Sequence, residues 1–278
     1  MNIEVAVQNP CLLGEGPIWD MEENILYFLD IISQKVHSYN PTNFQFLTYF
    51  FDIKITTIAK KKDNSWIGAS NRGFVNIDIK SQKYNIISNP ESHLINNRFN
   101  DGKLDSKGRV WAGTMDDIKG ELGVGKLYRL DLDGNVNIMI DNVTCSNGLA
   151  WSLDLKTFYF IDSLEYNVVA YDFEENSGEI TNPRVVLSFP KSEGLPDGMC
   201  IDENGFLWVA IWGGWKVVKC NPNTGEIIQE IKLPVSQVTS CAFNSDYSEL
   251  YITSASVGLN KEQLEKEPLA GSLFKVIL

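Results

Sequence analysis

Histidine is scarce in this sequence, with only His37 and His93 among 278 residues. The chain also lacks a G-x-S-x-G motif, the turn that carries the nucleophile in many serine hydrolases. Neither histidine falls in a repeated position of the chain, so we interpret both as surface or structural residues. The sequence therefore argues against serine hydrolysis that depends on a histidine base.

Paired cysteines and long apolar runs are also absent. The five cysteines are an odd number without a C-x-x-C pair, which indicates neither a disulfide framework nor a zinc knuckle. No segment approaches the ~18 apolar residues of a membrane span. The start, MNIEVAVQNP, lacks the basic and apolar regions of a secretion signal. We expect a cytoplasmic protein with buried free thiols.

Basic residues are fewer than acidic ones in this sequence. Lysine and arginine total 24 against 36 aspartate and glutamate residues, so the net charge is -12. This balance disfavours nucleic acids and anionic membranes as partners. We expect a small-molecule ligand and a monomer or weak dimer.

The chain does contain a repeat, a short apolar run centred on tryptophan or tyrosine. Its copies are separated by 39 to 49 residues, a spacing typical of propeller blades. Each run is rich in β-branched or aromatic residues and bounded by turn residues, which favours strands over helices. The six copies are ILYFLD at Tyr27, NSWIGAS at Trp66, GRVWAGT at Trp111, TFYFIDS at Tyr159, GFLWVAI at Trp208 and ELYITSA at Tyr251.

Turn residues and the lack of long helices support an all-β fold. Residues 105–108, 131–134 and 202–205 each begin with aspartate and end with glycine, as hairpin turns do. The best helix candidate, residues 260–268, is short and charged, so we expect a loop there. No linker interrupts the chain, so we predict one six-bladed β-propeller domain over residues 1–278. Residues 3–7 and 272–278 are expected to pair and close the ring.

A polar residue precedes the central tryptophan or tyrosine of five repeated runs by 10 to 12 positions, and in four of these repeats glycine follows it. Radial repetition would bring these positions together at one mouth of the central channel. The second repeat offers only Thr57 there. The other five positions are Glu15, Asp101, Asn147, Asp197 and Thr239.

Carboxylates gathered in this way would repel one another unless a cation lay between them. Carboxylate and amide oxygens suit hard ions such as Ca²⁺, Mg²⁺ or Mn²⁺, and Zn²⁺ and Fe²⁺ also accept carboxylates. A single Asp-Gly or Asn-Gly pair would be more typical of an ordinary turn. Four occurrences at one repeat position favour a site for one divalent metal ion.

Several long motifs resemble the regucalcin (senescence marker protein) and gluconolactonase family. They run from about Gly14 to the C-terminus and are LGEGPIW, NNRFNDGK, AGTM, SNGLAWSLD, FYFIDS, PDGMCID, LWVA and KLPVSQVTSCAF. The resemblance implies a six-bladed propeller with one divalent metal ion (Ca, Zn, Mn, Mg or Fe) at the channel mouth. It also implies hydrolysis of sugar lactones.

The resemblance further assigns roles to individual residues. It implies that Glu15, Asn147 and Asp197 bind the metal and that Asp197 is also the general base. Arg98 and Asn100 would bind the oxygens of the substrate, with Asp101 beside the metal rather than on it. The family carries an acidic substrate contact after AGTM, a place for which this chain offers Asp116 or Asp117 within a shorter, glycine-rich segment. We assign that contact to Asp117.

Two alternatives stay open at this point. The same site could hydrolyse another electrophile, such as a phosphotriester, an unusual lactone or a nitrile, as luciferin-regenerating relatives suggest. The protein could instead be a calcium-binding regulator without turnover. Three protein ligands leave coordination positions for water, which favours catalysis over calcium buffering.

Overall fold

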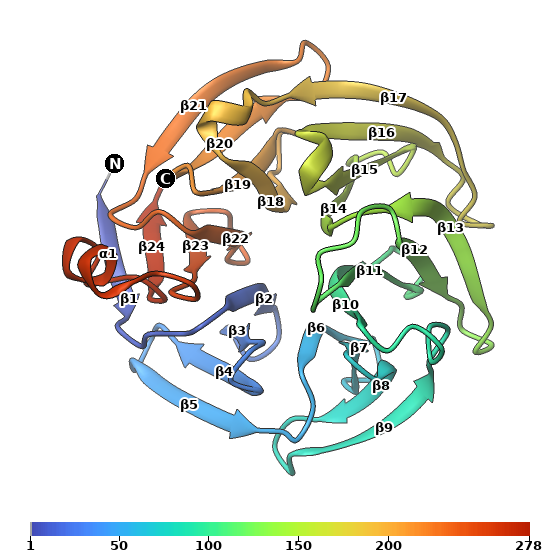
Figure 1. Cartoon of the computed structure of the whole chain (residues 1–278), viewed down its shortest axis with the longest axis horizontal. Helices are drawn as coiled ribbons and strands as arrows, with labels where there is room; N and C mark the ends of the chain where they lie inside the picture. Colours follow the sequence, from blue (N-terminus) through green and yellow to red (C-terminus); the bar gives the residue numbers. More distant parts are fainter. Residues whose placement is uncertain (1) are drawn as a thin grey trace.

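The repeated runs fold into six four-stranded antiparallel sheets arranged around a central channel (Figure 1). The computed structural model describes residues 2–278. Each sheet is one blade of a β-propeller, as predicted, and each repeated tryptophan or tyrosine lies on the second strand of its blade. The innermost strands are β2 (Gly14–Asp20), β6 (Ile55–Lys60), β10 (Asn97–Leu104), β14 (Ser146–Trp151), β18 (Leu195–Ile201) and β22 (Val238–Phe243).

Three further strands complete each blade toward the outside. Blades 1 and 2 continue with β3 (Ile25–Asp30), β4 (Lys35–Asn40) and β5 (Gln45–Phe50), and with β7 (Trp66–Ser70), β8 (Gly73–Asp78) and β9 (Lys83–Ser88). Blades 3 and 4 continue with β11 (Val110–Asp116), β12 (Gly125–Leu130) and β13 (Val136–Val143), and with β15 (Thr157–Asp162), β16 (Asn167–Phe173) and β17 (Ile180–Ser188). Blade 5 continues with β19 (Leu207–Trp212), β20 (Lys216–Asn221) and β21 (Glu226–Lys232).

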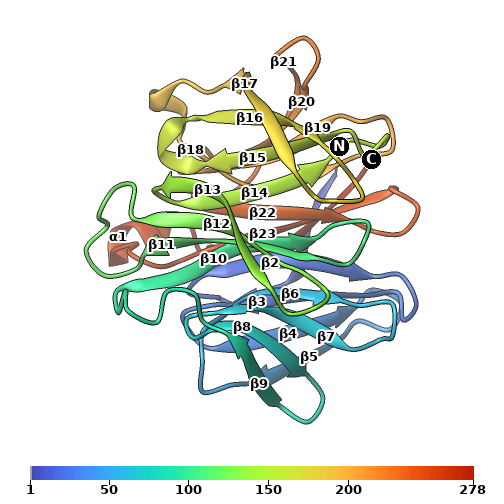
Figure 2. The same cartoon turned by 90° about the vertical axis from the view of Figure 1, so that its right-hand side faces the viewer.

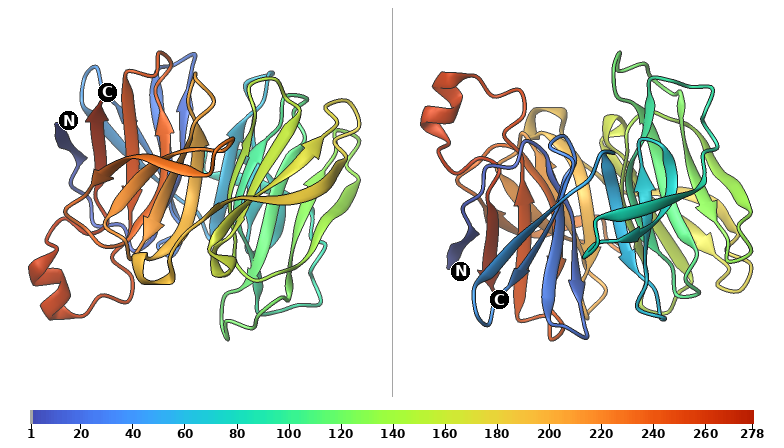
Figure 3. Two further views of the ribbon diagram at one scale, coloured as in Figure 1. Left: turned by 90° about the horizontal axis from the view of Figure 1, so that it is seen from above. Right: turned by 90° about the horizontal axis from the view of Figure 1, so that it is seen from below.

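The two ends of the chain meet in blade 6. This blade contains β22, β23 (Glu249–Ser254), β24 (Leu273–Ile277) and, as its outermost strand, β1 (Ile3–Val7). Strands β1 and β24 pair antiparallel, with Ile3 opposite Val276, which confirms the predicted closure. The side views show the blades stacked around the channel and both termini at the same blade (Figures 2 and 3).

The apolar core is divided among the junctions between blades. Each of six clusters of buried side chains joins two neighbouring blades, including one that joins blade 6 to blade 1. Trp111 and Phe158, for example, pack at a centroid distance of 5.0 Å between blades 3 and 4. Because burying apolar surface stabilises every junction, the ring holds the innermost strands in fixed positions around the channel.

Short helical turns occupy a few connections. Ser163–Glu165 and Lys191–Glu193 form 3₁₀ turns, and Lys261–Lys266 form α1. The prediction of a loop at residues 260–268 is therefore wrong over the residues that form α1. The reason is a capping box, in which the side chains of Asn260 and Gln263 each accept a hydrogen bond from the backbone N–H of the other residue. Within residues 2–278, no helix has the length and apolar character needed to cross a membrane.

Candidate functional site

All six innermost strands contain a β-bulge at the equivalent place. The pairing register with the second strand shifts between Glu15 and Ile18 in β2 and between Asn147 and Leu149 in β14, and corresponding shifts occur in β6, β10, β18 and β22. A bulge re-aims a side chain and is common beside functional sites. The polar positions of the sequence repeat fall at or beside these bulges.

Two of the glycines at these bulges allow neighbouring strands to approach closely. A Cβ atom on Gly148 would lie 2.8 Å from the carbonyl oxygen of Asp197. A Cβ atom on Gly198 would lie 2.1 Å from Oγ of Ser240. Glycine at these places therefore brings β14, β18 and β22 together around the channel.

A cavity of about 310 Å³ lies at one mouth of the channel, beside the starts of the innermost strands. Six residues that the sequence singles out line it, namely Glu15, Arg98, Asn100, Asp116, Asn147 and Asp197. Its other walls are mainly apolar and include Leu13, Met115, Leu164, Leu195 and Trp212. The structure thus brings together side chains from four different blades in one small pocket.

The two carboxylates in this cavity are buried. Glu15 and Asp197 are 8 % and 6 % exposed. In residues 2–278 neither forms an ion pair with lysine or arginine, and Arg98 is instead paired with Asp117. Burial raises the pKa of Glu15 to about 8, and the negative charge of Asp101 adds to that rise. Burial and the charge of Glu15 likewise raise the pKa of Asp197. The charge of Arg98 offsets only part of the rise at Glu15, so the negative charge of this pair is incompletely compensated.

A chain of hydrogen bonds fixes the amide of Asn147. Its Nδ2 donates to Oγ of Ser163 at 2.8 Å, and Ser163 donates to the carbonyl oxygen of Pro196 at 2.7 Å. Nδ2 of Asn100 donates to Oδ1 of Asn147 at 3.2 Å and to the carbonyl oxygen of Ser146 at 2.8 Å. With the nitrogen of Asn147 bound to Ser163 and one lone pair of its oxygen bound to Asn100, the second lone pair of that oxygen can accept a further bond.

The donor set therefore fits a hard or borderline divalent cation. Glu15 and Asp197 supply buried carboxylates, and Asn147 supplies an oriented amide oxygen. A cation there would compensate the buried negative charge. Asp101 does not line this cavity. The third acid that does is Asp116, whose carboxylate accepts hydrogen bonds from the backbone of Ile118 and Lys119.

Arg98 belongs to a network of its own beside the carboxylates. Its Nη1 donates to Oδ1 of Asn100 at 2.6 Å, and its Nε donates to Oδ1 of Asp117 at 2.6 Å. Lys54 donates to the other oxygen of Asp117 at 2.6 Å. Burial opposes ionisation of Asp117, but the charges of Arg98 and Lys54 outweigh it and lower the pKa of this carboxyl.

The two acids that follow the AGTM motif, Asp116 and Asp117, have different positions relative to the cavity. Asp116 lines the cavity, and its Oδ1 accepts hydrogen bonds from the backbone of Ile118 and Lys119. Asp117 is not among the lining residues, and both of its oxygens hold cationic side chains. A direct substrate contact by Asp117 stays a prediction, and its contacts favour a role in positioning Arg98.

Sequence reasoning did not identify Ser163 or Lys54. Ser163 ends the FYFIDS motif, so its position after a repeated strand was a usable signal. Lys54 reaches Asp117 from 63 residues away and carries no local signal.

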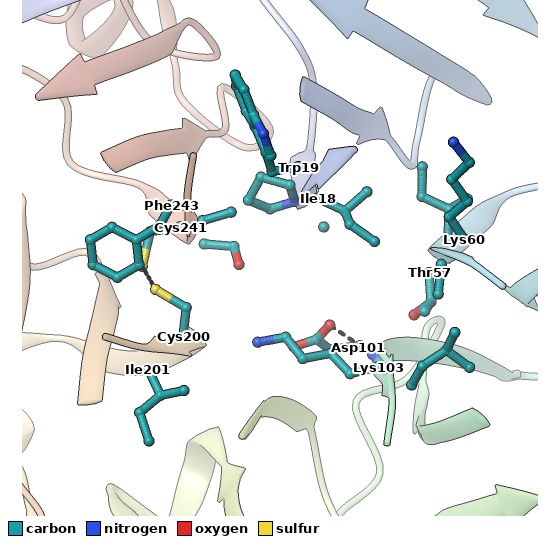
Figure 4. Close-up of a pocket in the computed structure, with 18 of the residues that line it drawn as sticks. Ile18, Trp19, Thr57, Lys60, Asp101, Lys103, Cys200, Ile201, Cys241 and Phe243 are labelled. Carbon is teal, nitrogen blue, oxygen red and sulfur yellow. Dashed lines mark hydrogen bonds between the residues drawn. The ribbon is translucent and has the colours of Figure 1, made fainter. Parts of the chain in front are cut away.

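A second cavity, of about 360 Å³, lies at the other mouth of the channel (Figure 4). Asp101 and Lys103 extend into it from β10, opposite Ile18 and Trp19 of β2. Cys200 and Cys241 lie beside each other on its wall, with their sulfur atoms 3.5 Å apart. Burial raises the pKa of Asp101. Asp101 thus lines this cavity and not the one that contains Asn147, although its charge still acts on Glu15 and Asp197.

Fold and site together define a six-bladed β-propeller in which buried carboxylate and amide oxygens converge at one channel mouth. The model of the family described as "SMP-30/Gluconolactonase/LRE-like region" matches residues 13–256. The chain belongs to this family.

Individual relatives are similar to this chain over nearly its full length. The chain is 42 % identical to regucalcin from Gallus gallus, and the match covers 99 % of this chain and 94 % of that protein. A solved luciferin-regenerating enzyme is 34 % identical with a TM-score of 0.92, covering 100 % of this chain and 95 % of that one. A structure described as a calcium-binding protein, regucalcin, from Agrobacterium tumefaciens is 27 % identical with a TM-score of 0.93, covering 98 % and 92 %.

Proposed function

We propose that this protein is a divalent-metal-dependent hydrolase that opens sugar lactones to aldonic acids. The observation that carries the proposal is the pair of buried carboxylates, Glu15 and Asp197, which form no ion pair in residues 2–278 and lie in the cavity that Arg98 and Asn100 also line. Membership of a family whose description includes gluconolactonase supports the substrate class.

Glu15, Asn147 and Asp197 would hold the metal ion. A bound divalent cation supplies Lewis-acid stabilisation of the negative charge that develops on the carbonyl oxygen of the lactone. The relative from Agrobacterium tumefaciens that is described as calcium-binding supports a divalent ion of this kind. Ser163 holds Asn147 in the orientation that this role requires.

Asp197 is the proposed general base. Its carboxylate takes a proton from water, and the resulting hydroxide oxygen attacks the lactone carbonyl carbon to give a tetrahedral intermediate. The bond between that carbon and the ring oxygen then breaks, and Asp197 returns the proton to the ring oxygen. The open-chain acid leaves without a covalent link to the protein.

Arg98 and Asn100 would orient the hydroxyl groups of the substrate. The guanidinium of Arg98 is a planar donor, and Asp117 fixes its orientation through Nε. At about 310 Å³ the cavity is at the small end of ligand pockets, as expected for a single sugar ring.

A second candidate function is hydrolysis of a less polar electrophile. The observation in its favour is the apolar wall of the cavity, which includes Leu164, Leu195 and Trp212. The similarity to a luciferin-regenerating enzyme supports the same alternative.

A substrate panel separates these functions. Metal-loaded protein is assayed with gluconolactone, xylonolactone, galactonolactone, an alkyl lactone without hydroxyl groups and a phosphotriester, each corrected for spontaneous hydrolysis. Preference for the three aldonolactones, lost in Asp197→Asn, supports the proposal. Preference for the apolar substrates supports the second candidate, and metal binding without any turnover would indicate a regulator rather than an enzyme.

A further inference from the structure

A group of ligand-type side chains lies outside both channel cavities, where blade 1 meets blade 6. Cys11, Asp30 and His37 each offer a ligand atom, and these atoms all lie within 4.8 Å of one another. All three residues are buried, with Cys11 and His37 each 1 % exposed. Within residues 2–278, no other three histidine, cysteine, aspartate or glutamate side chains meet this closely.

The three residues lie at the junction where blade 6 meets blade 1 and the ring closes. Asp30 ends β3 and His37 lies in β4, so both belong to blade 1. Cys11 lies in the segment that leads from β1 of blade 6 to β2 of blade 1, neighbouring blades in Figure 1. Its backbone N–H donates to the carbonyl oxygen of Gly271, and its carbonyl oxygen accepts from Oγ of Ser256, both in the connections of blade 6.

The imidazole of His37 is held by its neighbours and has one nitrogen without a hydrogen-bond partner in the described residues. Its ring packs against Phe28 and Phe46, at centroid distances of 4.9 and 5.1 Å, and Nδ1 pairs with Oγ1 of Thr48 at 3.0 Å. Its Nε2 is buried and has no hydrogen-bond partner in the described part of the chain. An outer partner on one nitrogen with the other nitrogen free is typical of histidine ligands. A buried polar atom without a partner requires an explanation.

We propose that Cys11, Asp30 and His37 form a structural site for a borderline divalent cation such as Zn²⁺, which joins the first and last blades. A thiolate and an imidazole select Zn²⁺ over Ca²⁺ or Mg²⁺, which prefer oxygen ligands. One thiolate, one carboxylate and one neutral imidazole balance the charge of the cation. The site therefore differs in chemistry from the all-oxygen site at the channel mouth.

Protonation states and geometry are compatible with this role. Burial lowers the pKa of His37 to about 4, so the imidazole is neutral at pH 7. Burial raises the pKa of the Cys11 thiol to about 12, so the thiol is protonated until a cation binds and its proton passes to solvent. Zinc bonds of about 2.0–2.3 Å place ligand atoms roughly 3.3–3.8 Å apart, so the side chains draw together slightly on binding.

The same three residue types also occur in cysteine hydrolases, but burial excludes that function here. Neither channel cavity is lined by Cys11, so no substrate reaches its sulfur from them. In the described residues Asp30 also forms no hydrogen bond with the ring of His37, as a catalytic triad would require, and its carboxylate instead accepts bonds from the backbone of Leu12 and Leu13. These bonds tie the segment that carries Cys11 to blade 1.

Cobalt substitution tests this site independently of any enzymatic activity. Co²⁺ bound to a thiolate gives a near-ultraviolet charge-transfer band, which oxygen ligands do not give. The protein carries Glu15→Gln to weaken the channel-mouth site and is titrated with CoCl₂. We expect a band that saturates at one equivalent, disappears in Cys11→Ser and persists in Cys145→Ser, which removes the thiol that lines the channel-mouth cavity.

Thermal unfolding with ZnCl₂ provides a second measurement. In the Glu15→Gln background, zinc should raise Tm more in the protein with intact Cys11 than in Cys11→Ser, because any remaining binding at the channel mouth is common to both proteins. If Cys11→Ser does not fold, His37→Phe keeps the aromatic packing, and its cobalt affinity should be weaker by about tenfold or more. Absence of the band, its persistence in Cys11→Ser, or an unchanged affinity in His37→Phe would overturn the proposal.

Discussion

At the residue scale, two kinds of buried acid can be contrasted in this protein. Asp105 binds Arg109 through Nε at 2.6 Å, and Asp202 binds Lys219 at 2.8 Å. Glu15 and Asp197 have no such partner in residues 2–278, and burial raises the pKa of both. Paired buried acids support the fold, whereas unpaired ones with raised pKa values are typical of functional sites.

Substitution separates the two roles proposed for Asp197. Asp197→Asn keeps an oxygen ligand but cannot accept a proton, so we expect kcat to fall by roughly 10² or more even at saturating metal. Asn147→Ala removes only an amide oxygen, and raising the metal concentration should recover part of its activity. Steady-state kinetics across a metal titration measure both effects. A rate near that of the wild type for Asp197→Asn at saturating metal would show that Asp197 is a ligand only.

A double-mutant cycle tests the link between Arg98 and Asp117. Arg98→Ala should raise KM for aldonolactones more than for an alkyl lactone, because only the former present hydroxyl groups to the guanidinium. If Asp117 acts by positioning Arg98, Asp117→Asn should raise KM in the wild type and have little effect in the Arg98→Ala background. Additive effects on KM would instead indicate a direct substrate contact by Asp117.

At the element scale, the blade is the repeated unit, and its turns are stabilised by buried aspartates. Asp202 begins the turn between β18 and β19, accepts backbone bonds from Asn204 and Phe206, and accepts a bond from Nε1 of Trp208 at 2.9 Å. Asp105 accepts the equivalent bond from Trp111 at 3.0 Å in blade 3. The spacing from aspartate to tryptophan in the sequence therefore encodes a contact that fixes the second strand against its turn.

Ionisation of Asp202 makes the free energy of unfolding of the protein depend on pH. Burial opposes ionisation, but the bonds from Lys219 and Trp208 outweigh it, so the folded pKa of Asp202 lies below its usual range. The stabilisation is therefore fully present above the unfolded pKa of about 3.9 and is lost as pH falls through the folded pKa. Asp202→Asn should lower the free energy of unfolding by about 1–3 kcal/mol at pH 7, and the difference from the wild type should shrink below pH 4.

Urea unfolding at pH 7 and pH 3 measures this difference. Glu203→Gln, an exposed change of the same charge in the same turn, serves as the control and should have little effect at either pH. A cost for Asp202→Asn that stays the same at both pH values would contradict the ionic explanation.

At the scale of the whole molecule, the repeat predicts the architecture because each blade reuses the same local signals. The spacing of Tyr27, Trp66 and their equivalents predicts six blades, and the pairing of β1 with β24 follows from the apolar ends of the chain. The positions of Glu15, Asn147 and Asp197 in one cavity follow from the radial symmetry of the ring.

Contacts between residues far apart in the sequence could not be predicted in this way. The ion pair of Lys54 with Asp117 joins blade 2 to the segment after β11, and the bond from Asn147 to Ser163 depends on side-chain rotamers. Asp101 precedes a glycine as Asp197 does, but it is the second residue within the bulge of β10, whereas Asp197 is the first within the bulge of β18. The first bulge residue of β10 is Asn100, which lines the cavity of Asp197, and Asp101 lines the opposite one. The sequence repeat predicts which innermost strand carries a polar side chain and where along that strand it lies. The position of the residue within the β-bulge determines which of the two channel cavities the side chain lines.

The central claim is that a divalent cation held by Glu15, Asn147 and Asp197 is required for lactone hydrolysis. Its most direct test is the rate of gluconolactone hydrolysis by protein whose metal has been removed, with removal verified by elemental analysis, before and after addition of Ca²⁺, Zn²⁺, Mn²⁺, Mg²⁺ or Fe²⁺. Glu15→Gln serves as the matched variant and should need a higher metal concentration for the same rate. We predict that metal removal reduces the rate to that of spontaneous hydrolysis and that at least one of these ions restores it. Full activity in the verified metal-free protein would contradict the account.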